Sequence, residues 1–189
     1  MELVYGESNS PFAVAWLSAL PVRVATNHRL PILEKTLLEI DVGGVPLFAT
    51  HLRAGRTERD AELRTAEAVA VLDEVGTGDC LLLGDLNAVN PAASVGIPPP
   101  EEGLEFVARE PVKALLDAGF EDCYRLQHPS ESGWTYLTWQ PWARLDYVLA
   151  RGGTAERLRS CDVVTSDDAL RASDHFPVVA EFDYPNVNA

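Results

Sequence analysis

The sequence predicts an α/β fold in which a mixed β-sheet is layered with helices on its outside. In the first half of the chain, apolar strand-like runs alternate with segments of helical periodicity, and from residue 135 onward strand-like runs predominate. The composition is that of a globular protein, with 47% hydrophobic and 23% charged residues among 189. We therefore expect one domain that spans residues 1–189, because no internal repeat, linker or low-complexity tract divides the chain.

Glycines mark a β-hairpin early in the chain. Residues 37–42 and 45–52 are apolar runs, and Gly43 and Gly44 between them readily supply the positive φ angles of a tight turn. Both faces of the second run are largely apolar, as expected for a central strand that is covered on each side.

A long helix is expected next, over residues 57–75. Thr57 and Asp60 have the spacing of a capping box, apolar residues then recur every three to four positions, and Gly76 follows. A short apolar strand over 80–83 ends abruptly at Gly84. Chemistry often occurs at such strand ends.

The second half of the chain is predicted from weaker patterns. Residues 88–111 are rich in proline and lack periodicity, which indicates a long loop that is functional or mobile. A short helix is expected over 112–118, ending at Gly119. Further strands are expected over 135–139, 145–150, 157–164 and 178–182.

Charge and cysteine content exclude several classes of protein. The 29 acidic residues against 15 basic ones give a net charge of −14, so a basic nucleic-acid coat is absent. Cys80, Cys123 and Cys161 are widely spaced without a CxxC pair, which favours reduced thiols over disulfides or zinc. The chain shows neither a leader-like start nor about 18 consecutive apolar residues, and we expect a cytoplasmic protein without a membrane span.

Four short stretches place polar or ionisable residues where an apolar strand begins or ends. They are Thr50-His51-Leu52, Gly84-Asp85-Leu86-Asn87-Ala88, Arg144-Leu145-Asp146-Tyr147-Val148, and Ser173-Asp174-His175-Phe176-Pro177-Val178. Polar groups beside buried strands must be hydrogen-bonded, paired or metal-bound. If these strand ends share one rim of a sheet, they bring carboxylates, imidazoles and an amide together, which are the parts needed for metal-assisted hydrolysis.

In these stretches the chain resembles the endonuclease/exonuclease/phosphatase superfamily, which has the pancreatic-deoxyribonuclease-like fold. The resemblance runs from about Tyr5 to Phe182, and residues 13–22 resemble the family's apolar-Leu-Ser-x-x-Pro strand. It implies a four-layer α/β sandwich, with two mixed sheets packed face to face and helices outside. It also implies hydrolysis of phosphate esters with Mg²⁺ or Mn²⁺.

The resemblance also implies roles for individual residues. His175 is similar to the imidazole that contacts the scissile phosphate or activates water, and Asp146 to the carboxylate that orients it. Asp174 resembles a metal ligand. Asp85 and Asn87 resemble the pair that positions the nucleophilic water and a phosphate oxygen, and His51 a donor to a phosphoryl oxygen. Arg53 follows His51 closely enough to be a substrate contact.

The start of the chain departs from the family pattern. The family normally opens with a strand ending in Asn, a helix, and a strand ending in Gln-Glu whose Glu is a principal metal ligand. Glu2 and Glu7 lack that context, and neither is taken as the ligand. We expect a domain that is incomplete at its N-terminus, with uncovered apolar sheet surface that favours self-association.

Several alternatives stay open at this point. The substrate could be DNA, a nucleotide, an inositol phosphate or a phospholipid head group. The chain could also be a catalytically impaired fragment or a non-catalytic interaction module, and a serine hydrolase using Ser173 is a further reading, although adjacent residues rarely form a triad. Trp134, Trp139 and Trp142 are interpreted as core residues or loop anchors in preference to a base-stacking platform.

Overall fold

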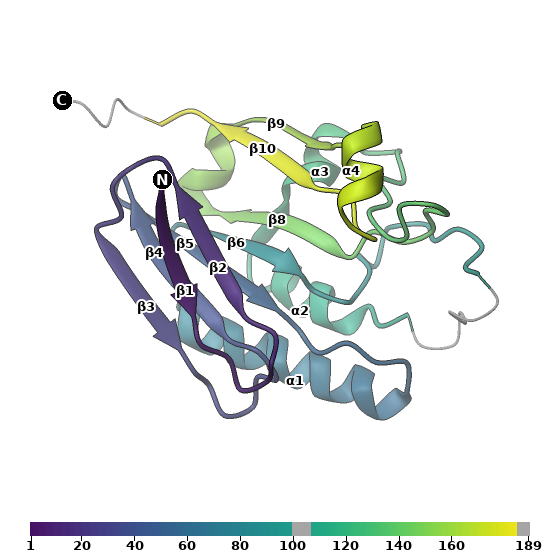
Figure 1. Ribbon diagram of the computed structural model, residues 1–189, viewed down its shortest axis with the longest axis horizontal. Helices are drawn as coiled ribbons and strands as arrows, with labels where there is room; N and C mark the ends of the chain where they lie inside the picture. The colour runs from purple at the N-terminus through teal and green to yellow at the C-terminus, as the bar shows by residue number, and fades with distance from the viewer. Residues whose placement is uncertain (100–106, 185–189) are drawn as a thin grey trace.

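A computed structural model describes residues 1–99 and 107–184, and its centre is a six-stranded mixed β-sheet (Figure 1). The strand order is β3-β4-β5-β6-β8-β7; β5 and β6 are parallel and the other neighbours antiparallel. The α/β class expected from the sequence is confirmed. The bounds are β3 Val24–His28, β4 Leu37–Val42, β5 Val45–His51, β6 Cys80–Asp85, β7 Phe120–Asp122 and β8 Asp146–Arg151.

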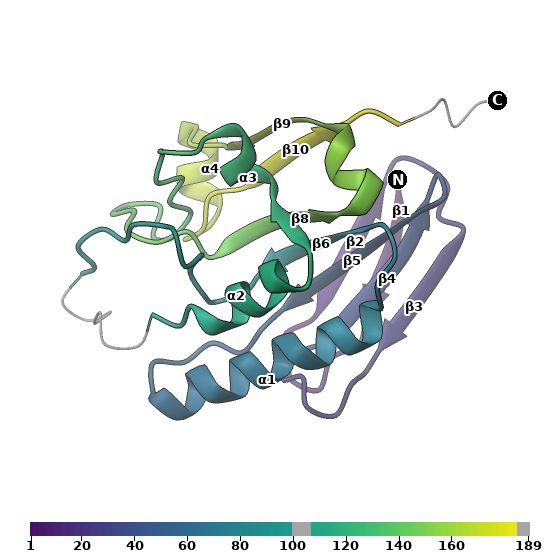
Figure 2. The same cartoon turned by 180° about the vertical axis from the view of Figure 1, so that it is seen from behind.

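Two helices, α1 (Glu58–Val75) and α2 (Glu110–Asp117), cover one face of this sheet (Figure 2). The predicted capping box starts α1: the Thr57 hydroxyl accepts the Asp60 N–H, and the Asp60 carboxylate accepts the Thr57 N–H. Apolar residues of both helices pack on Phe48, Leu82 and Leu149 in the larger hydrophobic core. This core fixes the strands whose ends carry the polar residues.

Two separate two-stranded antiparallel sheets lie over the opposite face (Figure 1). The pair β1 (Glu2–Gly6) and β2 (Val14–Ser18) contacts β4 and β5, whereas β10 (Val178–Phe182), paired with β9 (Leu158–Val163), contacts β8. The smaller helices are α3 (Cys123–Gln127), η1 (Gly152–Arg157) and α4 (Asp167–Ala172).

The outer face of the β1–β2 pair exposes apolar side chains. Leu3 is 62%, Tyr5 61% and Leu17 64% exposed, and Leu3 pairs directly with Leu17 across the two strands. This agrees with the expectation of uncovered apolar sheet surface.

The strongest sequence patterns gave the correct elements. The hairpin, the helix α1 and the strand β10 occur where they were predicted, to within one residue, and β6 extends two residues beyond the expected strand. The expected loop over 88–111 is irregular up to residue 99 and again over 107–109, while 100–106 lie outside the described residues.

The strand expected over 135–139 was wrong. Only Tyr136 makes β-bridges there, to Ala143 and to His175, because this segment crosses between two loops and does not run along a neighbouring strand. The strands β1, β3 and β7 were not predicted.

Two expectations about the whole chain can also be compared with the structure. Cys80, Cys123 and Cys161 are buried free thiols, as expected. Within 1–99 and 107–184, no helix combines the length and the apolar character that crossing a bilayer requires.

Candidate active site

Three polar residues stand in one row across neighbouring strands of the central sheet. His51 ends β5 and is the register partner of Asp85 at the end of β6, and Asp85 is the partner of Asp146 at the start of β8. Side chains at paired positions project from the same face of a sheet. The strand ends therefore converge at one rim, as the sequence predicted.

The turn after β6 is built by a glycine and an asparagine. Gly84 has φ of +140°, and a Cβ added there would lie 1.8 Å from the carbonyl oxygen of Thr50, so no larger residue fits. Asn87 adopts a positive φ of 47°, its N–H donates to Oδ1 of Asp85 at 2.8 Å, and its side-chain amide donates to the Leu52 carbonyl at 3.0 Å. This turn holds the Asp85 carboxylate at the rim.

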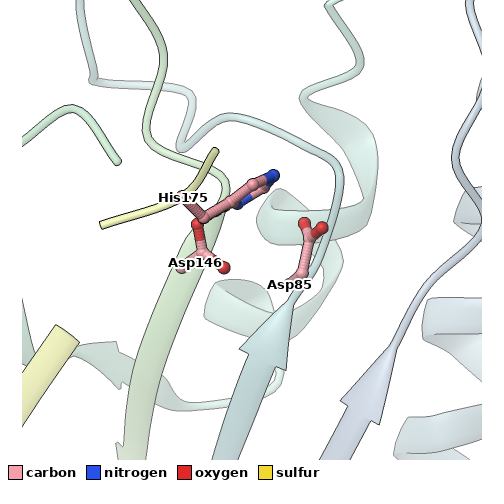
Figure 3. A group of neighbouring side chains, drawn as sticks. All are labelled: Asp85, Asp146 and His175. Carbon is pink, nitrogen blue, oxygen red and sulfur yellow. Dashed lines mark hydrogen bonds and ion pairs between the residues drawn. The ribbon is translucent and has the colours of Figure 1, made fainter. Parts of the chain in front are cut away.

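His175 reaches the same rim from the segment before β10 (Figure 3). Its Nδ1 lies 2.8 Å from Oδ2 of Asp146. The segment is held in place because Phe176 N–H donates to the Thr135 carbonyl at 2.8 Å and Thr138 N–H to the Asp174 carbonyl at 3.0 Å. The ring of Tyr136 packs against the imidazole, with centroids 4.7 Å apart.

Burial and neighbouring charges shift the pKa values of these groups in different directions. Burial and the charge of Asp146 raise the pKa of Asp85 to about 7. Burial and the positive charge of Lys35 lower the pKa of His51 to about 4, so its imidazole is neutral at pH 7. Burial opposes protonation of His175, but the hydrogen bond and charge of Asp146 outweigh it and raise the pKa of this imidazole. Divergent pKa values of this kind are typical of acid–base sites.

The rim contains groups that fit a divalent metal ion. Ligand atoms of Asp85, Asp146 and His175 lie within 4.8 Å of one another. Carboxylate oxygens suit Mg²⁺ or Mn²⁺, whereas an imidazole is a poor ligand for Mg²⁺. The Nδ1 atom of His175 is bonded to Asp146, whereas the contacts of Oδ2 of Asp85 with the Asn87 amide and with Nε2 of His51 are both 3.3 Å long, which leaves this oxygen the better placed to take an ion.

These residues line a cavity of about 640 Å³. Of the residues singled out in the sequence, His51, Asp85, Asn87, Asp146, Asp174 and His175 all border it. Asp174 is exposed and lies outside the group of three possible ligands. Arg53 is not part of the cavity lining; its guanidinium pairs with Glu34 at 3.0 Å.

Sequence reasoning did not identify several walls of the cavity. Phe12, Arg64, Val107 and Tyr136 border it but come from distant segments without a motif of their own. Trp142 is buried in a small core cluster, as interpreted from the sequence, yet it also lines the cavity, whereas Trp139 is 65% exposed. Only the tertiary fold brings these side chains together.

The serine-hydrolase reading does not fit the geometry. The Ser173 hydroxyl accepts the backbone N–H of His175 at 3.1 Å, whereas the His175 ring is bonded to Asp146. An activated serine needs its hydroxyl on the imidazole.

Comparisons with known proteins find a matching family model and similar solved structures. The model of the endonuclease/exonuclease/phosphatase family matches residues 3–175. A 3′ phosphatase, NExo from Neisseria, solved with a product DNA hairpin, superposes with a TM-score of 0.78 at 24% identity, over 97% of this chain and 79% of its own. No curated protein matched.

Two further solved structures are similar. The 3′-5′ exonuclease NExo from Neisseria meningitidis gives a TM-score of 0.75 at 25% identity, over 97% of this chain and 80% of its own. An AP endonuclease from Archaeoglobus fulgidus gives 0.76 at 22% identity, over 96% and 79%.

Proposed function

The chain belongs to the endonuclease/exonuclease/phosphatase family, and from this premise we propose that it is a divalent-metal-dependent phosphoesterase. It would hydrolyse a phosphodiester or phosphomonoester by in-line attack of water. The observation that carries the proposal is the Asp146–His175 hydrogen bond of 2.8 Å beside Asp85, at the rim of a cavity.

In this proposal the Asp146–His175 pair acts on the phosphoryl group. Asp146 accepts the proton on Nδ1, which fixes the tautomer and leaves Nε2 of His175 for the substrate. The raised pKa of His175 favours the protonated imidazole, which would donate a charged hydrogen bond to the phosphoryl oxygen on which negative charge develops.

Asp85 is the proposed group that orients the attacking water. Burial raises its pKa to about 7 in the metal-free chain, and a bound cation would lower that pKa and keep the carboxylate ionised. The amide of Asn87 donates to Oδ2 of Asp85 at 3.3 Å, and this weak bond can be exchanged for one to a phosphate oxygen. His51, neutral and 3.3 Å from Asp85, is proposed as a second donor to the substrate.

Asp174 and Asp85 are the residues proposed to hold Mg²⁺ or Mn²⁺, because both carboxylates border the cavity. A bound ion would neutralise the acidic rim and stabilise negative charge on phosphoryl oxygens. Replacing Asp174 by Asn should weaken Mn²⁺ binding, measured by electron paramagnetic resonance. The matched change Asp168→Asn, on the exposed first turn of α4, should not.

Hydrolysis in ¹⁸O-labelled water tests the proposal. Wild-type chain would be incubated with bis(p-nitrophenyl) phosphate and Mg²⁺, Mn²⁺ or EDTA, and the phosphate product analysed by mass spectrometry. Metal-dependent release of unlabelled nitrophenol is expected, with one ¹⁸O atom from water entering the phosphate product per cleavage. Folded protein that gives no turnover with either metal would favour the alternative of a non-catalytic module of the same fold.

A further inference from the structure

Most of the positively charged side chains of this chain are paired with acidic side chains or with backbone carbonyls of the fold. Every Lys and Arg lies in the described residues, since 100–106 and 185–189 contain none. Arg29 faces Glu7 at 3.4 Å and Arg53 faces Glu34 at 3.0 Å, and on α1 Arg59 faces Glu62 at 2.9 Å. Each such pair adds no net positive charge to the surface.

Other cations are held by the main chain or buried. Arg109 donates to the carbonyl oxygens of Asn90, Pro91 and Ala93. Arg125 and Arg151 also donate to backbone carbonyls, and Arg144 is buried against Asp122. A polyanion is bound mainly through Lys and Arg side chains that neutralise its phosphates, and this fold offers few of them.

Three carboxylates and two guanidinium groups border the cavity, so it is not strongly positive. Arg56 and Arg64 line it, but Arg64 is 2% exposed and donates to the carbonyls of Arg53 at 2.6 Å and Gly55 at 2.8 Å. The carboxylates of Asp85, Asp146 and Asp174 border the same space. A bound divalent ion could offset this charge for one phosphoryl group, but not along a row of phosphates.

The remaining walls are apolar and aromatic. Phe12, Val107, Tyr136 and Trp142 border the cavity, and the rings of Tyr136 and Trp142 have centroids 6.2 Å apart. A volume of about 640 Å³ is that of a pocket for one small molecule. The pocket thus combines a site for a single phosphoryl group with a wall for a flat apolar group.

We propose that the substrate is a small phosphate ester of nucleotide size, with one reacting phosphoryl group and one aromatic ring system, in preference to duplex DNA. This inference rests on the proposed phosphoesterase function and names the substrate class of the same site. It differs from the DNA bound by the Neisseria 3′ phosphatase, whose 24% identity shows a shared fold.

Binding measurements test the substrate class without depending on turnover. The chain in Mg²⁺ would be titrated calorimetrically with thymidine 5′-phosphorothioate and, separately, with a DNA duplex of about 20 base pairs, at about 50 and 200 mM salt. We expect the nucleotide to bind at least as tightly as the duplex, with less than about a threefold loss at the higher salt. Duplex binding that is about a hundredfold tighter and falls steeply with salt would overturn the proposal, as would failure of the nucleotide to bind.

A pair of aromatic variants locates the binding. Phe12 is 67% exposed and lines the cavity, whereas Trp139 is 65% exposed and does not, so neither substitution should unfold the chain. Phe12→Ala should raise the nucleotide Kd about tenfold and Trp139→Ala should leave it unchanged. Equal changes of the nucleotide Kd in the two variants would contradict the proposal that Phe12 contacts the bound ring system.

A parallel hydrolysis assay separates this inference from the proposed function. p-Nitrophenyl thymidine 5′-phosphate carries the phosphoryl group and the rings in one molecule. If the nucleotide binds but this ester is not hydrolysed with metal, the phosphoesterase proposal is refuted. The proposed ligand class of the pocket then still stands. Hydrolysis of duplex DNA with a kcat/KM more than about tenfold above that for the ester would refute the substrate class alone.

Discussion

The Nδ1 atom of His175 lies 2.8 Å from Oδ2 of Asp146, although the residues are 29 positions apart in the chain. The contact joins the start of β8 to the segment before β10, and His175 also forms a backbone bridge with Tyr136. A loop and a strand end thus share one hydrogen bond at the centre of the candidate site.

Asp146→Asn should lower kcat for phosphate ester hydrolysis by about 10²–10⁴-fold. The amide cannot accept the Nδ1 proton as a carboxylate does, so the imidazole loses its orientation and its pKa falls. Steady-state kinetics and the NMR titration of His175 would measure both effects. Asp162→Asn is the matched control, because Asp162 pairs with His128 at 3.0 Å outside the cavity lining; equal losses in both variants would contradict the role of Asp146.

Gly84→Ala should destabilise the fold by about 3 kcal/mol or more. The new Cβ would lie 1.8 Å from the Thr50 carbonyl oxygen, in a backbone conformation with φ of +140°. Urea unfolding monitored by circular dichroism gives the difference in the free energy of unfolding. Gly78→Ala, where a Cβ meets nothing within 4 Å, should be neutral or stabilising. Equal losses in the free energy of unfolding for the two variants would contradict the conclusion that the turn at Gly84 excludes a side chain.

In the metal-free protein, the contribution of His51 to stability should be lost as the pH falls from about 6.5 to about 4, while the raised pKa values of Asp85 and His175 act in the opposite direction. In that window His51 takes up a proton in the unfolded chain but not in the fold, because its folded pKa is about 4 against an ordinary value of 6.5. At this site the unfolded state therefore binds more protons than the fold. In urea unfolding, the free energy of unfolding of wild type should fall relative to that of His51→Asn as the pH is lowered across this window; parallel profiles for wild type and variant would contradict it.

The β1–β2 pair should cause self-association of the chain. Leu3, Tyr5 and Leu17 form an exposed apolar face on it. Leu17→Glu should shift the population toward monomer in light scattering. Val69→Glu on α1, where the native side chain is 46% exposed, should have no such effect. A monodisperse wild-type monomer would count against the prediction.

The sequence predicted those elements that local signals define. Gly43 and Gly44 marked the hairpin and Thr57 with Asp60 marked the start of α1, because turns and caps depend on a few adjacent residues. The strand β3 was missed because Val24–His28 is short, largely exposed and carries no apolar alternation. The expected strand over 135–139 failed because its backbone pairs with two loops.

The candidate site could likewise be predicted from the sequence only in part. His51, Asp85 and Asp146 could be predicted to meet, since each stands at the end of an apolar strand and neighbouring ends share a rim. The roles given to them came from the family resemblance and stay proposals. Phe12 and Trp142 could not be predicted as cavity walls, because their proximity to the rim depends on how distant loops fold.

The most direct test of the account is hydrolysis of bis(p-nitrophenyl) phosphate by wild type, His175→Ala and His128→Ala, each with Mn²⁺ and with EDTA. His128 also faces an aspartate, at 3.0 Å, but borders no part of the cavity. The account predicts Mn²⁺-dependent turnover by wild type and His128→Ala, and a loss of about 10²-fold or more in His175→Ala. Turnover that survives in EDTA, or that His175→Ala retains in full, would contradict it.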